Sequence, residues 1–191
     1  ADEQLARVYE RYAHTLVQSN ALDFDDLLLR TVTLFDTSAD ARARYSERFR
    51  FVMVDEYQDT NRPQYLLVRH LTATHRNICV VGDPDQSIYK WRGADLRNIL
   101  DFETDFPETK VVRLERNYRS TQVILDAASE IISRNTNRKA KRLWTDQEGG
   151  ALIICHRAHD ELSEADFIVT KLRAALLADI STVAVLYRTN A

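Results

Sequence analysis

The sequence contains few of the residues that mark flexible linkers, disulfide scaffolds or membrane spans. Its 191 residues include only four glycines, three prolines and two cysteines. So little glycine and proline argues against a linker or a disordered chain and predicts a compact protein rich in helices and strands. Cys79 and Cys155 are too far apart for a C-x-x-C metal or redox motif. Each lies in an apolar run, so we expect both to be small buried side chains, which suits a reducing cytoplasm.

An excess of positive charge and long apolar runs are also missing. Lys and Arg number 26 against 29 Asp and Glu, a net charge of −3, so no global basic field attracts nucleic acid. Any contact with DNA must therefore come from a local groove. No apolar run approaches the ~18 residues of a membrane span, and we expect no membrane partner. The length suits one or two small domains.

Residues 1–49 have a helical pattern. Apolar side chains recur at three- and four-residue steps, at Leu5, Val8, Tyr9, Tyr12 and Leu16. A second helix is predicted from about Asp23 to Phe35. Asp23, Asp25 and Asp26 gather at its start, where a metal site is one interpretation. We favour the simpler one, in which carboxylates in the first turn are stabilised by the helix dipole.

From Arg50 onward the pattern alternates between strand and helix. Strands are predicted at 51–55, 77–82, 110–114, 151–156 and 182–187, and helices at about 63–73, 94–103, 120–134 and 160–178. The strands are continuous apolar runs, which favours a parallel sheet covered on both faces. Such sheets bind ligands beyond the carboxyl ends of their strands. The predicted fold class is therefore α/β with an N-terminal helical segment.

The first block with chemical character runs from Phe51 to Asn61. Its strand ends in Asp55 and Glu56, which fits a nucleotide-hydrolysing site with one carboxylate for Mg²⁺ and one for the attacking water. The alternative is that the strand ends in acids only because loops are polar. No G-x-x-x-x-G-K-[S/T] loop, which would hold the triphosphate, occurs anywhere in the sequence. The residues therefore predict one half of a motor site.

The second block runs from Val80 to Ala94 and also begins at a strand end. Gln86 could hydrogen-bond a phosphate or a water. Tyr89, Lys90, Trp91 and Arg92 alternate aromatic rings with cations. Proteins bind single strands with this composition, because bases stack on the rings while the cations bind phosphates. The alternative is an aromatic pair inside a domain core with solvated cations beside it.

The third block runs from Leu114 to Thr121. The guanidinium of Arg119 could contact a γ-phosphate in a bidentate way, and Tyr118 could stack on a base. Ser120 or Thr121 can cap the helix that follows. The alternatives are an ordinary helix cap and a surface ion pair.

Together and in this order, the three blocks resemble motifs II, III and IV of the UvrD/PcrA/Rep-type superfamily 1 DNA helicases. Residues 183–190 resemble the motif that follows, so the likeness covers nearly the whole chain. It implies RecA-like parallel sheets flanked by helices, as parts of two RecA-like domains. By this plan residues 1–49 end an inserted helical subdomain, 50–115 are the later part of the first motor domain, and 116–191 begin the second.

The resemblance also implies roles at the matching positions. Asp55 would bind Mg²⁺, Glu56 would orient the attacking water, and Gln86 would sense the γ-phosphate. Tyr118 would stack on adenine, and Arg119 would contact the γ-phosphate across the cleft. The positions that would contact DNA are Tyr89, Trp91, Arg92, Arg188 and Asn190. Pro84 and Arg116 stand where the family more often has Ala or Ser and Gln, respectively.

The implied parent protein is an ATP-dependent DNA helicase, using ATP and Mg²⁺ and moving 3′ to 5′ in repair or replication. Its expected partners are single-stranded DNA, single/double-strand junctions and accessory repair proteins, in a bacterial cytoplasm associated with the nucleoid. We expect the phosphate loop to lie upstream of residue 1 and later motifs beyond Ala191, so the chain alone should be inactive. The alternatives are a truncated, non-catalytic single-strand-binding or protein-interaction module, and the motor part of a helicase-nuclease.

Overall fold

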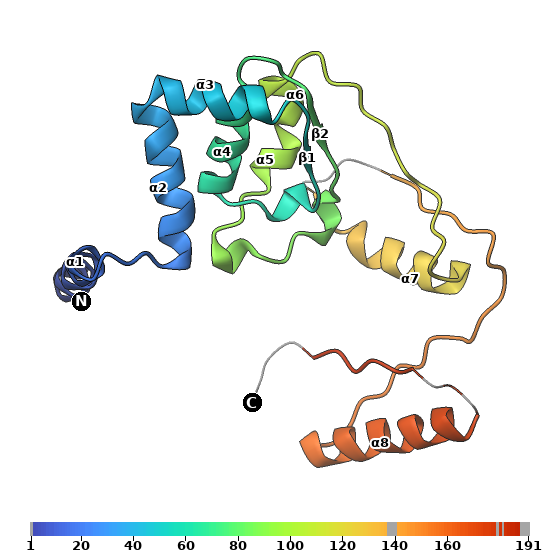
Figure 1. Cartoon of the computed structure of the whole chain (residues 1–191). Helices are drawn as coiled ribbons and strands as arrows, with labels where there is room; N and C mark the ends of the chain where they lie inside the picture. Colours follow the sequence, from blue (N-terminus) through green and yellow to red (C-terminus); the bar gives the residue numbers. More distant parts are fainter. Residues whose placement is uncertain (1, 137–140, 179, 181, 188–191) are drawn as a thin grey trace. The chain divides into compact units, whose positions relative to one another are not determined.

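The computed structural model describes residues 2–136, 141–178, 180 and 182–187 (Figure 1). Its contacts divide the chain into two compact units. The first comprises Ala1–Asn117 and Ala128–Trp144, and the second comprises Tyr118–Ala127 and Thr145–Ala191. Within the described part of the chain, no helix is both long and apolar enough to cross a bilayer.

The N-terminal segment is helical, as predicted. It contains α1 (Asp2–Gln18), α2 (Phe24–Thr37) and α3 (Ala39–Arg48). The side chain of Asp23 caps α2 by accepting a hydrogen bond from the backbone N–H of Asp26 at 2.7 Å. Asp25 and Asp26 lie in the first turn of the same helix, as the helix-terminal interpretation of the acidic cluster predicts.

Helices α2 and α3 pack against α4 (Arg62–Thr72). Phe35, which is 3 % exposed, lies at the centre of this helical layer. Its ring centroid is 5.7 Å from that of Tyr45 on α3 and 6.0 Å from that of His70 on α4. Pro63 lies in the first turn of α4, where its missing N–H leaves no hydrogen bond unmade.

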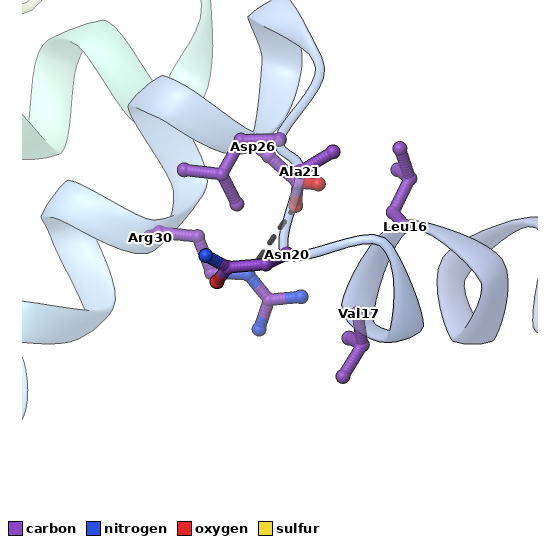
Figure 2. A pocket seen from close by; sticks show the side chains of 7 residues that line it. Leu16, Val17, Asn20, Ala21, Asp26 and Arg30 are labelled. Atoms are coloured by element: carbon purple, nitrogen blue, oxygen red, sulfur yellow. Dashed lines mark ion pairs between the residues drawn. The ribbon is translucent and has the colours of Figure 1, made fainter.

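Helix α1 has no buried residue, and its apolar stripe is exposed. A hollow of about 350 Å³ lies between the end of α1 and the start of α2 (Figure 2). Arg30 and Asp26 form an ion pair of 3.3 Å at its wall. Asp26 of the acidic cluster lines this hollow, but none of the residues predicted to bind nucleotide or DNA does.

Two of the predicted strands form a parallel pair. β1 (Val52–Val54) and β2 (Ile78–Val80) align Val52 with Ile78 and Val54 with Val80. The prediction that both faces would be covered is wrong for this pair, because Met53 is 78 % exposed. The two cysteines are also exposed rather than buried. In a strand, alternate side chains point to opposite faces, and only one face of this pair packs on the core.

That core consists of Tyr57, Phe102 and Phe106, packed against Val54, Ile78, Val80 and Ile99. The rings of Tyr57 and Phe102 meet edge to face at 5.6 Å, and burial raises the pKa of Tyr57 to about 12. The two phenylalanines stack at 4.7 Å. The helix predicted at 94–103 is instead two short helices, α5 (Arg97–Leu100) and α6 (Phe102–Asp105). The chain leaves the helical conformation at Asp101, and the next residue, Phe102, is buried in the core.

The remaining predicted helices are present, whereas the remaining predicted strands are not. Helices α7 (Gln122–Ile132) and α8 (Glu161–Leu177) lie close to their expected positions. The described residues at 110–114, 151–156 and 182–187 form no ladder. An apolar run carries a tendency for strand, but a strand exists only where a partner accepts its hydrogen bonds. In these runs large side chains such as Leu114 and Leu186 are 80 % and 91 % exposed.

Candidate functional site

Asp55 and Glu56 begin a tight loop directly after β1, and we call residues 55–61 the carboxylate loop. The Oδ1 atom of Asp55 accepts a hydrogen bond from the N–H of Glu56 at 2.9 Å. Both carboxylates are exposed. Glu56 has φ 50° and ψ 41°, a left-handed conformation that costs a non-glycine residue of order 1–3 kcal/mol. Such strain persists only where the surroundings hold it, so the contacts of the next residues decide where Glu56 points.

Two contacts fix the loop behind Glu56. The N–H of Tyr57 donates to the carbonyl of Val81 at 3.0 Å, which continues the strand pairing beyond β1. Gln58 is 1 % exposed, and its Nε2 donates to Oε2 of Glu56 at 2.7 Å. Its Oε1 accepts from the N–H of Asp83 at 3.0 Å. The carboxylate of Glu56 is therefore tied to the segment that follows β2.

Gln58 is not among the site residues predicted from the sequence. Its position in Asp-Glu-Tyr-Gln-Asp gave no cue, because a glutamine between acids is most often a solvated loop residue. Only the folded chain shows that this amide is buried and that it uses both of its ends.

Gln86 lies in the short turn after β2, and we call residues 83–86 the glutamine turn. The turn contains the 3₁₀ helix Pro84–Gln86, capped by Asp83, whose carboxylate accepts from the N–H of Asp85 at 3.0 Å. The same carboxylate accepts from Nε2 of Gln86 at 2.8 Å. It also forms an ion pair with Lys141, whose Nζ lies 3.2 Å from Asp85.

These contacts affect the ionisation of Asp83. Burial alone would raise the pKa of its carboxyl. The hydrogen bonds from Lys141, from Gln86 and from the N–H of Asp85, with the charge of Lys141, outweigh burial and lower the pKa below the ordinary value. Asp83 is therefore held as a carboxylate, which keeps the side chain of Gln86 in place.

The aromatic segment, residues 89–92, follows the glutamine turn. The rings of Tyr89 and Trp91 lie 6.4 Å apart, and the guanidinium of Arg92 lies 4.5 Å from the Trp91 ring and 5.5 Å from that of Tyr89. Trp91 is 74 % exposed and Tyr89 is 39 % exposed. Gly93, with φ 83°, ends the turn in a conformation that other residues rarely adopt. The alternative of an aromatic pair buried in a core does not describe this segment.

The aromatic segment is attached to the carboxylate loop on both sides. Before it, the N–H of Ile88 donates to Oδ1 of Asp59 at 3.3 Å. After it, the N–H of Asp95 donates to the carbonyl of Thr60 at 3.1 Å. The buried side chain of Asn98 donates to the same carbonyl at 3.0 Å and to the hydroxyl of Thr60 at 3.1 Å. The loop and the segment therefore form one hydrogen-bonded piece.

The third block crosses the boundary between the two units. In the first unit, the guanidinium of Arg116 lies 5.4 Å from the ring of Trp144. Tyr118 and Arg119 belong to the second unit, and both are exposed. The carbonyl of Tyr118 accepts from Nε2 of Gln147 at 2.7 Å. The predicted DNA-contacting residues Arg188 and Asn190 lie outside the described residues.

The sequence matches two family models that together span most of the chain. Residues 1–107 match the UvrD/REP helicase N-terminal domain, and residues 112–191 match the UvrD-like helicase C-terminal domain. The chain belongs to the UvrD/REP helicase family. This membership confirms the resemblance that the motifs predicted and the α/β fold of RecA-like type.

Several relatives of this UvrD/REP family chain are named ATP-dependent DNA helicase PcrA. The protein of Bacillus subtilis (strain 168) is 48 % identical over 100 % of this chain and 26 % of its own length. That of Staphylococcus epidermidis (strain ATCC 12228) is 48 % identical and that of Leuconostoc citreum 49 % identical, each over 99 % of this chain and 26 % of its own length. The chain thus spans about a quarter of the length of these curated relatives.

The two domain matches of the UvrD/REP family divide the candidate residues. The carboxylate loop, the glutamine turn and the aromatic segment all lie within the N-terminal-domain match. Tyr118 and Arg119 lie within the C-terminal-domain match. The carboxylate loop, the glutamine turn and the aromatic segment therefore share both one structural unit and one family match.

Proposed function

We propose that this chain forms part of the motor of an ATP-dependent DNA helicase. The observation that carries the proposal is that hydrogen bonds join the carboxylate loop, the glutamine turn and the aromatic segment into one piece. It contains some of the groups that nucleotide hydrolysis needs, two carboxylates and a glutamine, beside aromatic rings and a cation of the kind that bind single strands. The name of the PcrA relatives supports the same assignment.

Asp55 is the residue that would hold Mg²⁺. Its carboxylate is exposed, and one of its oxygens is engaged by the N–H of Glu56. Mg²⁺ is commonly bound by one or two carboxylates together with substrate phosphates and waters, and this donor set fits that arrangement. When bound, the ion would neutralise charge on the phosphates of ATP.

Glu56 is the residue that would orient the attacking water. Its backbone conformation and the hydrogen bond from Gln58 fix the direction of its carboxylate. Gln86, at the end of its own turn, would contact the γ-phosphate. Tyr118 and Arg119 would contribute the adenine stack and a second γ-phosphate contact from the C-terminal-domain part of the chain.

The DNA-contacting residues would be Tyr89, Trp91 and Arg92, with Arg188 and Asn190 further along. The substrate would be single-stranded DNA and its junctions with duplex, and movement would run 3′ to 5′. We place the parent protein in DNA repair or replication, in a bacterial cytoplasm associated with the nucleoid and with accessory repair proteins as partners.

The decisive experiment is the change Glu56→Gln in the full-length protein. We expect DNA-stimulated ATP hydrolysis to fall by about 10²- to 10⁴-fold, the range for loss of a general base, while binding of Mg·ATP is kept. Hydrolysis is measured as phosphate release with and without oligo-dT, and Mg·ATP binding is measured with a fluorescent ATP analogue. Glu10→Gln, a matched change at an exposed position of α1, is the control. Normal turnover in the Glu56 variant would sink the assignment.

The same assay on the 191-residue chain alone tests the half-site interpretation. The sequence contains no phosphate-cradling loop, and losing one such preorganised donor already costs about 10²–10³ in rate. We therefore expect no phosphate release. DNA-stimulated release that is lost with Glu56→Gln would refute the half-site interpretation. A full-length protein that binds oligo-dT but never hydrolyses ATP would instead favour the non-catalytic binding module.

A further inference from the structure

The side chain of Gln58 is buried and hydrogen-bonded at both ends, which suits a residue that holds the carboxylate of Glu56 in place. It is 1 % exposed, and a buried amide without partners is costly. Both ends of its amide are used, one by the carboxylate of Glu56 at 2.7 Å and one by the N–H of Asp83 at 3.0 Å. Its side chain thus lies between the loop after β1 and the turn after β2.

The chemistry of the partners permits only one orientation of this amide. A carboxylate can only accept a hydrogen bond, and a backbone N–H can only donate one. The NH₂ group of Gln58 must therefore face Glu56, and its carbonyl oxygen must face Asp83. A flipped amide would place an acceptor against the carboxylate and a donor against an N–H.

The backbone beside Gln58 is shaped to admit this side chain. A Cβ atom at Gly82 would lie 2.6 Å from Oε1 of Gln58, 2.9 Å from Cδ1 of Ile99 and 3.1 Å from the backbone N of Tyr57. Real Cβ atoms essentially never lie within 3.0 Å of another heavy atom, so a Cβ here would force the ends of the Gln58 and Ile99 side chains to shift. Glycine at position 82 leaves space for the oxygen that accepts from the N–H of Asp83.

The contacts continue from Asp83 to the glutamine turn. Its carboxylate accepts from Nε2 of Gln86 at 2.8 Å and pairs with Lys141. An unbroken sequence of contacts therefore runs from Glu56 through Gln58 and Asp83 to Gln86.

We propose that Gln58 is a positioning residue that aims the Glu56 carboxylate and couples it, through Asp83, to the turn that carries Gln86. The proposal rests on the proposed function, in which Glu56 orients the attacking water. Gln58 itself contacts neither ATP nor water in this role. Among the contacts of the described residues, Gln58 is the only side chain that donates a hydrogen bond to the carboxylate of Glu56.

Two variants of the full-length protein distinguish the effect of the hydrogen bonds of Gln58 from the effect of its size and shape. Gln58→Met keeps the length and volume but removes both hydrogen bonds. We expect kcat for DNA-stimulated hydrolysis to fall by about 10- to 100-fold, the usual cost of removing a supporting partner, with the KM for ATP changed by less than about threefold. A structural fault at the site would instead raise the KM for ATP as well, and kcat is taken per ATP-binding molecule, so that a loss of folded protein does not lower it.

Gln58→Glu gives a readout that loss of structure would not produce. Two carboxylates at hydrogen-bond distance share a proton, and the pKa of one of them rises. The introduced carboxyl group can again donate to Glu56 when it is protonated, whereas it repels Glu56 when it is ionised. We therefore expect the kcat of this variant, relative to wild type, to rise as the pH falls from about 8 to about 6. For Gln58→Met the kcat relative to wild type should be the same at both pH values. Because each variant is compared with itself at two pH values, a constant loss of folded protein does not affect this comparison.

The matched control is Gln64→Glu. It makes the same chemical change on the next element, where Gln64 accepts from the N–H of Asn61 at 2.9 Å, a role that Glu can also fill. We expect wild-type kcat and pH dependence. Gly82→Ala is the independent variant. It displaces Oε1 of Gln58 without altering any polar group, and kcat should fall as in Gln58→Met.

The outcomes distinguish a failure of the proposed function from a failure of the role proposed for Gln58. If the wild-type protein shows no DNA-stimulated hydrolysis, the proposed function fails and the role of Gln58 fails with it. If the wild type is active and Glu56→Gln is inactive, but Gln58→Met keeps kcat within about twofold, only the Gln58 proposal is overturned. It is also overturned if Gln58→Glu and Gln58→Met are equally impaired at both pH values.

Discussion

Replacing Trp91 by Ala in the full-length protein should weaken binding of single-stranded DNA without weakening the fold. Trp91 is 74 % exposed, and its ring has the guanidinium of Arg92 on it at 4.5 Å. The substitution removes the largest exposed ring of the aromatic segment. The ring of Tyr89 remains beside Arg92 at 5.5 Å, so part of the binding surface is kept.

The magnitude follows from what one ring contributes. A base stacked on an aromatic side chain is worth about 1–3 kcal/mol, and about 1.4 kcal/mol corresponds to a factor of ten in Kd. We expect the Kd for oligo-dT to rise by about 5- to 150-fold. The free energy of unfolding should change by less than about 0.5 kcal/mol, because the side chain is mostly in solvent.

The assay is fluorescence anisotropy of a labelled oligo-dT, at one fixed salt concentration because phosphate contacts make the affinity salt-dependent. Phe24→Ala is the matched control, since Phe24 is an aromatic residue 89 % exposed at the start of α2. It should leave the Kd for DNA unchanged. Affinity for an ATP analogue should be unchanged in both variants.

Three results would refute this reasoning. An unchanged Kd for oligo-dT in Trp91→Ala would mean that no base stacks on this ring. An equal loss of DNA affinity in Phe24→Ala would mean that exposed aromatic surface in general, rather than the aromatic segment, is responsible. A fall in DNA affinity that accompanies a large fall in the free energy of unfolding would show that Trp91 acts through the fold.

Two further predictions concern stability. Asn61 caps α4 through a reciprocal pair of hydrogen bonds with Gln64 at 2.9 and 3.0 Å, so Asn61→Ala should lower the free energy of unfolding by about 1 kcal/mol in urea; an unchanged urea midpoint would contradict it. The pKa of Asp83 is lower in the folded chain, because hydrogen bonds from Lys141 and its neighbours outweigh burial. Its stabilising contribution is therefore fully present above the ordinary Asp pKa of about 3.9 and is lost as the pH falls below it. Lys141→Met should flatten the loss of stability in that window, and an equally steep loss in wild type and variant would contradict the role of the pair.

The features that the sequence predicted well are local ones. Asp55 and Glu56 follow an apolar run that does form a strand, and Pro63 does lie in the first turn of a helix. Such features depend on residues a few positions apart, whose preferences are intrinsic to the chain. The family could also be predicted, because three blocks in a fixed order combine several such local patterns.

The features that could not be predicted depend on residues far apart in sequence. Gln58 and Asp83 meet only because β1 and β2 pair in parallel with one particular register. The exposure of Met53 depends on which face of that pair the core occupies. The predicted strands at 110–114, 151–156 and 182–187 needed hydrogen-bonding partners, which an apolar run does not specify by itself.

The attachment of the aromatic segment at both ends has a mechanical consequence. A loop held at one end can absorb a displacement by bending, whereas a segment bonded before Tyr89 through Asp59 and after Arg92 through Thr60 has to follow the carboxylate loop. The second attachment is costly to break, because moving Thr60 away would leave the buried side-chain amide of Asn98 without its hydrogen-bond acceptors. A few hydrogen bonds within one unit therefore connect the loop that carries Glu56 to the segment that carries Trp91. Under the proposed motor function, these bonds link the chemical step to the movement of a stacked base. Asn98→Ala should uncouple the two, so that basal ATP hydrolysis is kept and its stimulation by DNA is reduced.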